Sequence, residues 1–228
     1  MAHPRPARRP AVEARLVPLG RHVAAVVVAF LLLPATVALA KPLKLLAFGD
    51  SLVAGYGLDA EAAFPVQLEA ALQAKGHDVR VINGGVSGDT TAAGRARLAW
   101  SLAERPDAVI VELGANDALR GLDPAKVYEN LNAILTTLRG EGLPVLLAGM
   151  YALRNLGPEY RKEFDAVYPR LAEEHGVPLY PFFLDGVVLN PELNQFDGLH
   201  PNARGVAVIV ERILPHVIEL IERAEAHG

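Results

Sequence analysis

Apolar and polar positions alternate in blocks along residues 41–228, and the lengths of these blocks predict a mixed α/β domain. Five short runs rich in Val, Leu and Ile occur at Leu43–Phe48, Val79–Asn83, Ala108–Leu113, Val145–Gly149 and Val177–Tyr180. Longer segments with helical spacing occupy Glu61–Lys75, Thr90–Ala103, Pro124–Arg139, Glu159–His175 and about Asn202 to Ala224. Almost wholly apolar strands that alternate with helices indicate a parallel sheet covered on both faces. We therefore predict a flavodoxin-like three-layer α/β/α sandwich with a five-stranded parallel sheet.

The first 40 residues follow a different pattern, with an arginine-bearing start, an apolar run from Val23 to Leu33 and the sequence Ala-Leu-Ala at 38–40. This order is typical of a secretory signal peptide, which predicts cleavage before Lys41 and a mature domain over 41–228. An uncleaved membrane anchor is the alternative. The run is interrupted by Pro34 and is shorter than the roughly 20 apolar residues of a spanning helix, which favours cleavage. We expect a periplasmic or secreted protein without a stable membrane span after cleavage.

Composition narrows the class of partner. The first 40 residues hold five of the 22 basic and one of the 26 acidic residues, so 17 basic and 25 acidic residues remain and give a net charge of −8. Nucleic acid binding needs clustered Lys and Arg, so we expect a small-molecule substrate and no nucleic acid. The chain has no cysteine, which excludes disulfides and a thiolate nucleophile. We expect neither a metal nor a cofactor.

The first apolar run stops abruptly at Gly49-Asp50-Ser51. A serine at the end of a buried strand can be presented at the edge of an α/β sheet while its backbone is held rigid. Gly-Asp-Ser is also ordinary turn chemistry. Ser51 is therefore a candidate nucleophile that needs a base and oxyanion donors from elsewhere in the chain.

His200 is the candidate base. It lies in Asp-Gly-Leu-His-Pro-Asn at 197–202, and Asp197 can fold back to accept from its Nδ1–H, which leaves Nε2 for the serine. The alternative is that Asp197 and Asn202 only cap structure. The remaining histidines of the mature chain are interpreted as capping or surface residues: His77, His175, His216 and His227.

Two loops offer oxyanion donors. Gly88 follows the second predicted strand and precedes a helix, so its backbone N–H can point into the site. Asn116 follows the third strand, and its amide is a neutral donor to a developing negative charge. Taken singly, Gly88 is more simply interpreted as a turn glycine and Asn116 as a helix-capping residue.

Four segments together resemble the blocks of the GDSL, or SGNH, hydrolase family, and they occur in the family's order. They are Phe-Gly-Asp-Ser-Leu at 48–52, Gly88, Gly-x-Asn-Asp at 114–117 and Asp-x-x-His at 197–200. The resemblance spans essentially all of residues 41–228. It is greatest to the bacterial exported thioesterase I/lysophospholipase/arylesterase subgroup, on the stretches 87–90, 111–114, 116–121 and 181–183.

The resemblance implies a role for each matching residue. Ser51 would be the nucleophile, His200 the general base and then acid, and Asp197 its orienting carboxylate. The oxyanion hole would consist of the backbone N–H groups of Ser51 and Gly88 and the side-chain amide of Asn116.

The loop after the fourth strand helps to close over the acyl chain in this subgroup. The matching residues here are Leu153, Asn155, Leu156, Gly157 and Tyr160. Asn155, Gly157 and Tyr160 fit the subgroup's pattern. Leu153 and Leu156 depart from it, which bears on chain-length preference.

We therefore predict a serine esterase/thioesterase with arylesterase, acyl-CoA thioesterase and lysophospholipase-type activities, working through a Ser-His-Asp acyl-enzyme. The alternative within the family is a carbohydrate acetyl esterase. A third interpretation is a non-catalytic binding protein that keeps the fold.

Overall fold

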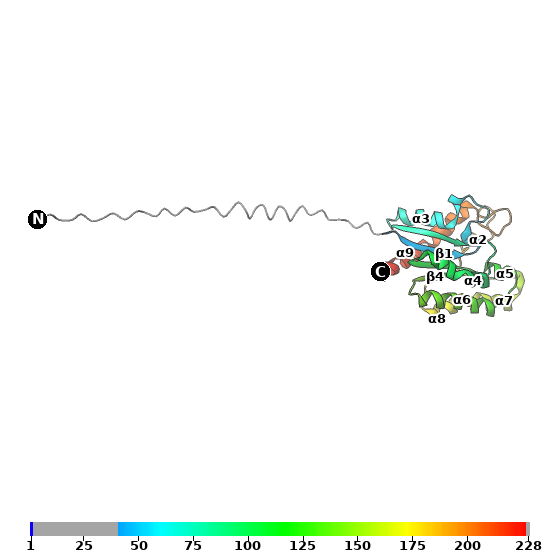
Figure 1. Cartoon of the computed structure of the whole chain (residues 1–228). Helices are drawn as coiled ribbons and strands as arrows, with labels where there is room; N and C mark the ends of the chain where they lie inside the picture. The colour runs from blue at the N-terminus through cyan, green and yellow to red at the C-terminus, as the bar shows by residue number, and fades with distance from the viewer. Residues whose placement is uncertain (2–40, 227–228) are drawn as a thin grey trace. The chain divides into compact units, whose positions relative to one another are not determined.

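The computed structural model describes Met1 and residues 41–226, so the predicted signal peptide, apart from Met1, lies outside the described residues. Its sheet has the strand order β2-β1-β3-β4-β5, and every pair is parallel (Figure 1). The strands are β1 (Leu43–Gly49), β2 (Val79–Gly85), β3 (Ala108–Glu112), β4 (Val145–Ala148) and β5 (Leu179–Tyr180). This is the flavodoxin-like order, in which the chain reverses direction across the sheet between β1 and β3. The predicted five-stranded parallel sheet is confirmed.

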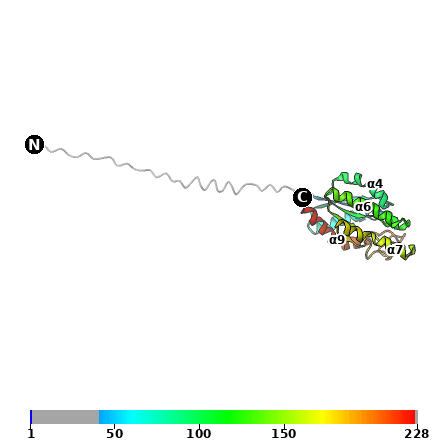
Figure 2. The same ribbon diagram turned by 90° about the horizontal axis from the view of Figure 1, so that it is seen from below.

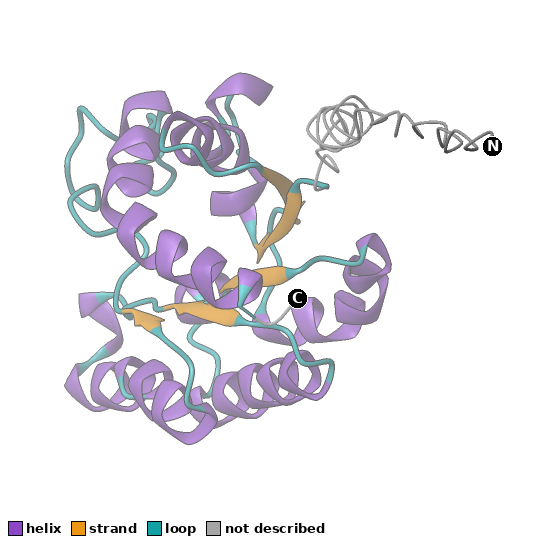
Figure 3. Cartoon of the chain, turned by 90° about the vertical axis from the view of Figure 1, so that its left-hand side faces the viewer, coloured by secondary structure: helices purple, strands orange, loops and turns teal. Residues whose placement is uncertain are grey.

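Helices cover both faces of the sheet (Figure 3). Helices α3 (Phe64–Ala74) and α9 (Ala203–Glu225) contact one another on one face. The other face is covered by α4 (Thr91–Ser101), α6 (Pro124–Gly140), α7 (Pro158–Asp165) and α8 (Val167–His175), and α4 and α6 lie side by side in Figure 2. The short helices are α2 (Ser51–Ala54), α5 (Ala115–Leu119), η1 (Ala60–Ala62), η2 (Leu102–Glu104) and η3 (Arg154–Leu156). The predicted three layers are confirmed.

The helix predicted over Glu159–His175 is two helices, α7 and α8, which meet at Ala166. Pro169 explains the break, because a proline has no N–H to donate to the carbonyl four residues earlier, and its ring crowds that carbonyl. The carbonyl in question belongs to Asp165, the last residue of α7. The sequence patterns also missed α2 and α5, which each follow a strand by one or two residues.

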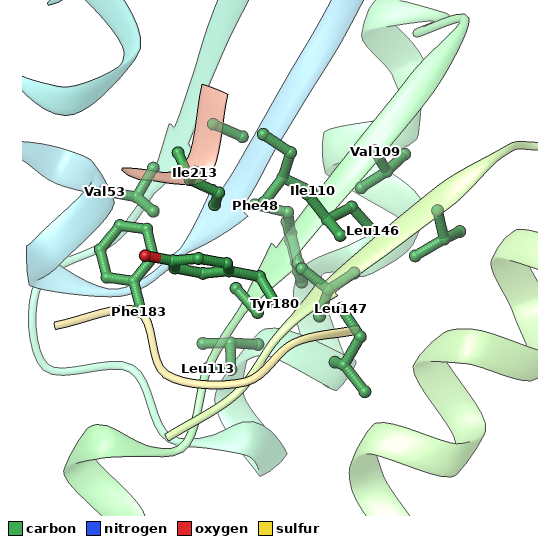
Figure 4. Close-up of a cluster of buried hydrophobic side chains, with 14 of the residues drawn as sticks. Phe48, Val53, Val109, Ile110, Leu113, Leu146, Leu147, Tyr180, Phe183 and Ile213 are labelled. Carbon is green, nitrogen blue, oxygen red and sulfur yellow. The ribbon is translucent and has the colours of Figure 1, made fainter. Parts of the chain in front are cut away.

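A continuous apolar core fixes the ends of the strands. Figure 4 shows Phe48, Ile110 and Leu147, from β1, β3 and β4, beside Phe183 and Ile213. All five side chains are fully buried. Because interiors pack as densely as organic crystals, the carboxyl ends of β1 and β3 are held with little freedom. Among residues 41–226, no helix is long and apolar enough to cross a membrane.

Candidate active site

Ser51 lies at the carboxyl edge of the sheet as the first residue of α2. Asp50 caps this helix, because its Oδ1 accepts a hydrogen bond from the backbone N–H of Leu52 at 3.0 Å. Gly49 ends β1, and an added Cβ there would stand 2.5 Å from Val53 Cγ2. Ser51 is thus held where the strand order reverses, which is the usual ligand position in open α/β sheets.

The loop before α9 brings His200 to Ser51. His200 Nε2 lies 2.9 Å from Ser51 Oγ, and Nδ1 lies 2.7 Å from Asp197 Oδ2. Hydrogen bonds from the backbone of His200 and Leu199, and the His200 side chain, lower the pKa of Asp197 to about 2. Asp197 is therefore ionised at neutral pH and can only accept, so Nδ1 carries the imidazole proton and Nε2 accepts the hydroxyl of Ser51. Asp197 thus organises its own turn as well as the imidazole, and Asn202 does cap α9.

Tyr56 and Gln195, which are not among the predicted site residues, lie beside His200. The ring of Tyr56 lies 4.7 Å from that of His200, at an interplanar angle of 41°. Gln195 Nε2 donates to the carbonyls of Tyr56 at 2.7 Å and of Pro201 at 3.0 Å. The Gln195 backbone N–H donates to the His200 carbonyl at 2.7 Å. Neither residue belongs to a motif, so only the folded chain identifies them.

Gly88 lies on the loop between β2 and α4, and Asn116 lies on the short helix that follows β3. Gly88 has φ +86°, a left-handed conformation that favours glycine, and Arg120 donates to its carbonyl at 2.9 Å. Asn116 is in α5, and its Nδ2 donates to Asp50 Oδ2 at 3.0 Å. An amide nitrogen carries two hydrogens, so the second stays available to another acceptor.

Asp117, next to Asn116, anchors α5. Its Oδ2 accepts the backbone N–H of Thr91 at 2.8 Å, and its Oδ1 accepts the Thr91 hydroxyl at 2.7 Å. Burial raises the pKa of Asp117, against these hydrogen bonds. Asp117 thus fixes α5 to α4, and the neighbouring Asn116 lines the pocket.

An apolar cavity of about 130 Å³ opens beside Ser51 and His200. Tyr151 and Phe182 stack in its wall, with ring centroids 4.6 Å apart. It is lined by Ser51, Leu52, Ala115, Asn116, Ala118, Leu119, Met150, Tyr151, Leu153, Phe182, Leu184, Val188, Asn194, Gly198, Leu199 and His200. Most of this lining comes from the loops after β4 and β5, of which the motifs mark only His200 and its neighbours and the stretch 181–183.

Of the five residues predicted for the substrate loop, Leu153 lines this cavity, and Asn155, Leu156, Gly157 and Tyr160 lie outside its lining. Tyr160 Oη donates to the Leu122 carbonyl at 2.8 Å. These residues follow the loop away from the pocket and towards the turn after α5. Their predicted contact with substrate stays a prediction.

Within residues 41–226, no three His, Cys, Asp or Glu side chains are grouped so that they could hold a metal ion. A second cavity, of about 290 Å³, lies among residues that include Arg139, Val145 and Val177. It is at the amino ends of β4 and β5 and shares no residue with the pocket beside Ser51.

A flavodoxin-like sheet with a serine, a histidine and an aspartate in one hydrogen-bonded chain at its edge, beside an apolar pocket, is typical of serine hydrolases. Comparison with known proteins narrows this class to a family. The profile of the GDSL-like Lipase/Acylhydrolase family matches residues 47–208. The chain belongs to this family, and the resemblance found in the sequence is confirmed.

Similar proteins carry related activities in their names. The chain is 42% identical to an arylesterase of Vibrio mimicus over 177 residues, which covers 77% of this chain and 88% of the relative. It is 40% identical to esterase TesA of Pseudomonas aeruginosa over 178 residues, which covers 78% and 89%. Among solved structures, AlinE4, an SGNH-hydrolase family esterase, matches with TM-score 0.68 and 48% identity over 80% of this chain and 98% of that one.

Proposed function

We propose that this protein is a serine esterase/thioesterase that hydrolyses carboxylic esters and thioesters with small apolar acyl or aryl groups. The names of two relatives, an arylesterase and an esterase, support ester hydrolysis. The observation that carries the proposal is the continuous hydrogen-bonded chain of Asp197, His200 and Ser51, with distances of 2.7 and 2.9 Å. A serine hydroxyl is a weak nucleophile, and a neutral imidazole in hydrogen-bond contact removes that weakness.

The reaction follows from this geometry. Ser51 Oγ attacks the acyl carbonyl while His200 Nε2 takes the hydroxyl proton. His200 then gives that proton to the leaving alcohol or thiol as its bond to the acyl carbon breaks, which leaves an acyl-serine. Water attacks the acyl-serine with His200 as base, and the carboxylic acid departs as Ser51 regains its proton. Asp197 stays ionised and holds the imidazole in place.

The oxyanion of each tetrahedral intermediate would be held by the backbone N–H groups of Ser51 and Gly88 and the amide of Asn116. Gly88 supports this role because its left-handed turn is open, with no atom closer than 3.9 Å to an added Cβ. Asn116 supports it because it lines the pocket, and its amide nitrogen has a second hydrogen that the bond to Asp50 does not use.

The cavity argues for a small apolar group. An apolar cavity of about 150 Å³ holds one benzene, so about 130 Å³ accommodates roughly six carbon atoms. We expect kcat/KM for p-nitrophenyl esters to rise from acetate to about hexanoate and to gain little beyond. Activity confined to acetate would instead support the carbohydrate acetyl esterase.

A fluorophosphonate probe tests the nucleophile. Wild type should be labelled and Ser51→Ala should not, whereas Ser87→Ala, at an exposed serine on the Gly88 loop, should label like wild type. Equal labelling of Ser51→Ala would overturn the assignment.

Export is a separate proposal, and it rests on the signal-like pattern of residues 1–40. Amino-terminal sequencing of the protein from the periplasm of a bacterial host should begin at Lys41. An intact amino terminus in the membrane fraction would overturn it.

A further inference from the structure

Behind Ser51, two carboxyl groups are buried together that the proposed reaction does not use. Asp50 and Glu112 are both fully buried. Glu112 ends β3 and lies in register with Gly49 of β1. An added Cβ on Gly49 would stand 2.6 Å from Glu112 Oε2, so the glycine leaves room for this carboxyl beneath the serine loop.

The contacts of Glu112 indicate that it carries a proton. Its Oε2 accepts the backbone N–H of Asp50 at 3.3 Å, and its Oε1, also buried, has no donor. An ionised oxygen without a donor is costly to bury, whereas a protonated one is itself a donor. Burial and the negative charge of Asp50 raise the pKa of Glu112 well above its ordinary value.

The contacts of Asp50 indicate the opposite state. Its Oδ1 accepts the Leu52 backbone N–H and its Oδ2 accepts the Asn116 amide, both at 3.0 Å. Burial raises the pKa of Asp50 to about 6, and these two hydrogen bonds oppose the rise. Asp50 is thus ionised at neutral pH and above, and it joins the serine loop to the candidate oxyanion donor.

Other charged groups near the pair come from the α9 loop, α5 and α4. His200 lowers the pKa of Asp50, and Asp117 raises it. Arg97, on α4, is ion-paired with Asp89. Since Arg97, the nearby cation on α4, is already ion-paired with Asp89, one shared proton is the arrangement that leaves a single buried charge on the pair.

We propose that Glu112 stays protonated during turnover and donates to Asp50, and that the anionic Asp50 so held positions the Asn116 amide as an oxyanion donor. Asp50 and Glu112 are then positioning residues. The proposal rests on the proposed function. One hydrogen of the Asn116 amide then donates to a charged acceptor, and such a hydrogen bond is stronger than one to a neutral acceptor. The second hydrogen of the amide remains available to an oxyanion.

A double-mutant cycle tests the link between Asp50 and Asn116. Loss of an oxyanion donor lowers kcat about 10²–10³-fold, so Asn116→Ala should do so with KM little changed. Asp50→Asn should lower kcat about 10–100-fold, because its single amide oxygen cannot accept from both the Leu52 N–H and Asn116, and an NH2 group that faces Asn116 cannot accept. The double variant should be within about threefold of Asn116→Ala, since coupled residues are not additive. Full multiplication of the two losses would overturn the proposal.

The protonation of Glu112 is tested without relying on those variants. The infrared carbonyl band of a buried carboxylic acid should be present in wild type at pH 8 and absent in Glu112→Gln. Glu112→Gln, which keeps a donor and an acceptor, should retain at least tenfold more kcat than Glu112→Ala. A missing band, or equal losses, would overturn the proposal. The proposed function fails separately, in the labelling of Ser51→Ala.

Discussion

Replacing Asp50 by Asn should stabilise the fold at high pH while it lowers activity. In the native state the pKa of Asp50 is raised by burial to about 6, against an ordinary value of 3.8. The native state therefore binds more protons than the unfolded chain between these values, and wild type loses stability as the pH rises through this window. A shift of about 2 units corresponds to about 3 kcal/mol at 1.36 kcal/mol per unit, and the carboxyl is buried, so screening by solvent is small.

Asn is nearly isosteric with a neutral Asp, so the variant escapes this loss. Below about pH 4 the two proteins should have free energies of unfolding within about 1 kcal/mol, because only rearranged hydrogen bonds then distinguish them. Above pH 7 the variant should be more stable by about 2–3 kcal/mol. Such a gain alongside a loss of kcat is the expected trade-off at a site that buries a charge for function.

Urea unfolding at several pH values between 4 and 8 measures the difference, because the titrations of groups that do not interact with Asp50 cancel between the two proteins. Glu112, whose pKa the Asp50 charge raises, adds to the difference in the same direction. Asp197→Asn is the control of opposite sign. Hydrogen bonds lower the pKa of Asp197 to about 2, so its own stabilising contribution is present above about pH 4 and is lost as the pH falls through about 2. A pH-independent difference for Asp50→Asn would refute the reasoning, since it would mean that folding does not shift this carboxyl.

Three other predictions concern the site and its supports. Asp197→Asn should lower kcat for a nitrophenyl ester by about 10³–10⁴-fold with an unchanged circular dichroism spectrum, because an amide cannot fix the imidazole tautomer; a loss below tenfold would contradict the role. Gly114→Ala should lower the free energy of unfolding in urea by more than about 3 kcal/mol, because φ is +123° and the added Cβ would stand 2.0 Å from Tyr168 Oη. The control Gly142→Ala, at φ +74° with open space around the Cβ, should lower it by about 1–2 kcal/mol. Equal losses would contradict the steric argument. Leu153→Ala should lower kcat/KM for a hexanoate ester about fivefold and leave kcat/KM for the acetate ester unchanged. Leu156→Ala, outside the cavity lining, should change neither value. An equal effect of both variants would place the acyl group elsewhere.

The sequence by itself determined the architecture and the candidate chemistry. The apolar runs of β1, β3 and β4 are too uniform for half-exposed strands, which indicates a parallel sheet covered on both faces. The run of β2 alternates, with Arg80 exposed, as fits a strand at the edge of the sheet. Ser51, Asn116 and His200 each follow an apolar strand or precede a helix, and four motifs in family order are specific even though each alone is a common turn. Such signals are local, and local signals can be read from order along the chain.

Only the tertiary structure decided what surrounds those residues. Glu112 reads as one polar position at the end of a strand, and its burial against Asp50 depends on the register of β1 with β3. Tyr56 and Gln195, which contact one another beside His200, are 139 positions apart in the sequence, so no short pattern marks their contact. The pocket also depends on the fold, because its apolar lining combines residues of α2 and α5 with residues of the loops after β4 and β5. The physical reason is that burial, charge pairing and cavity shape are properties of neighbours in space, and these are set when the packed sheet brings distant loops to one edge.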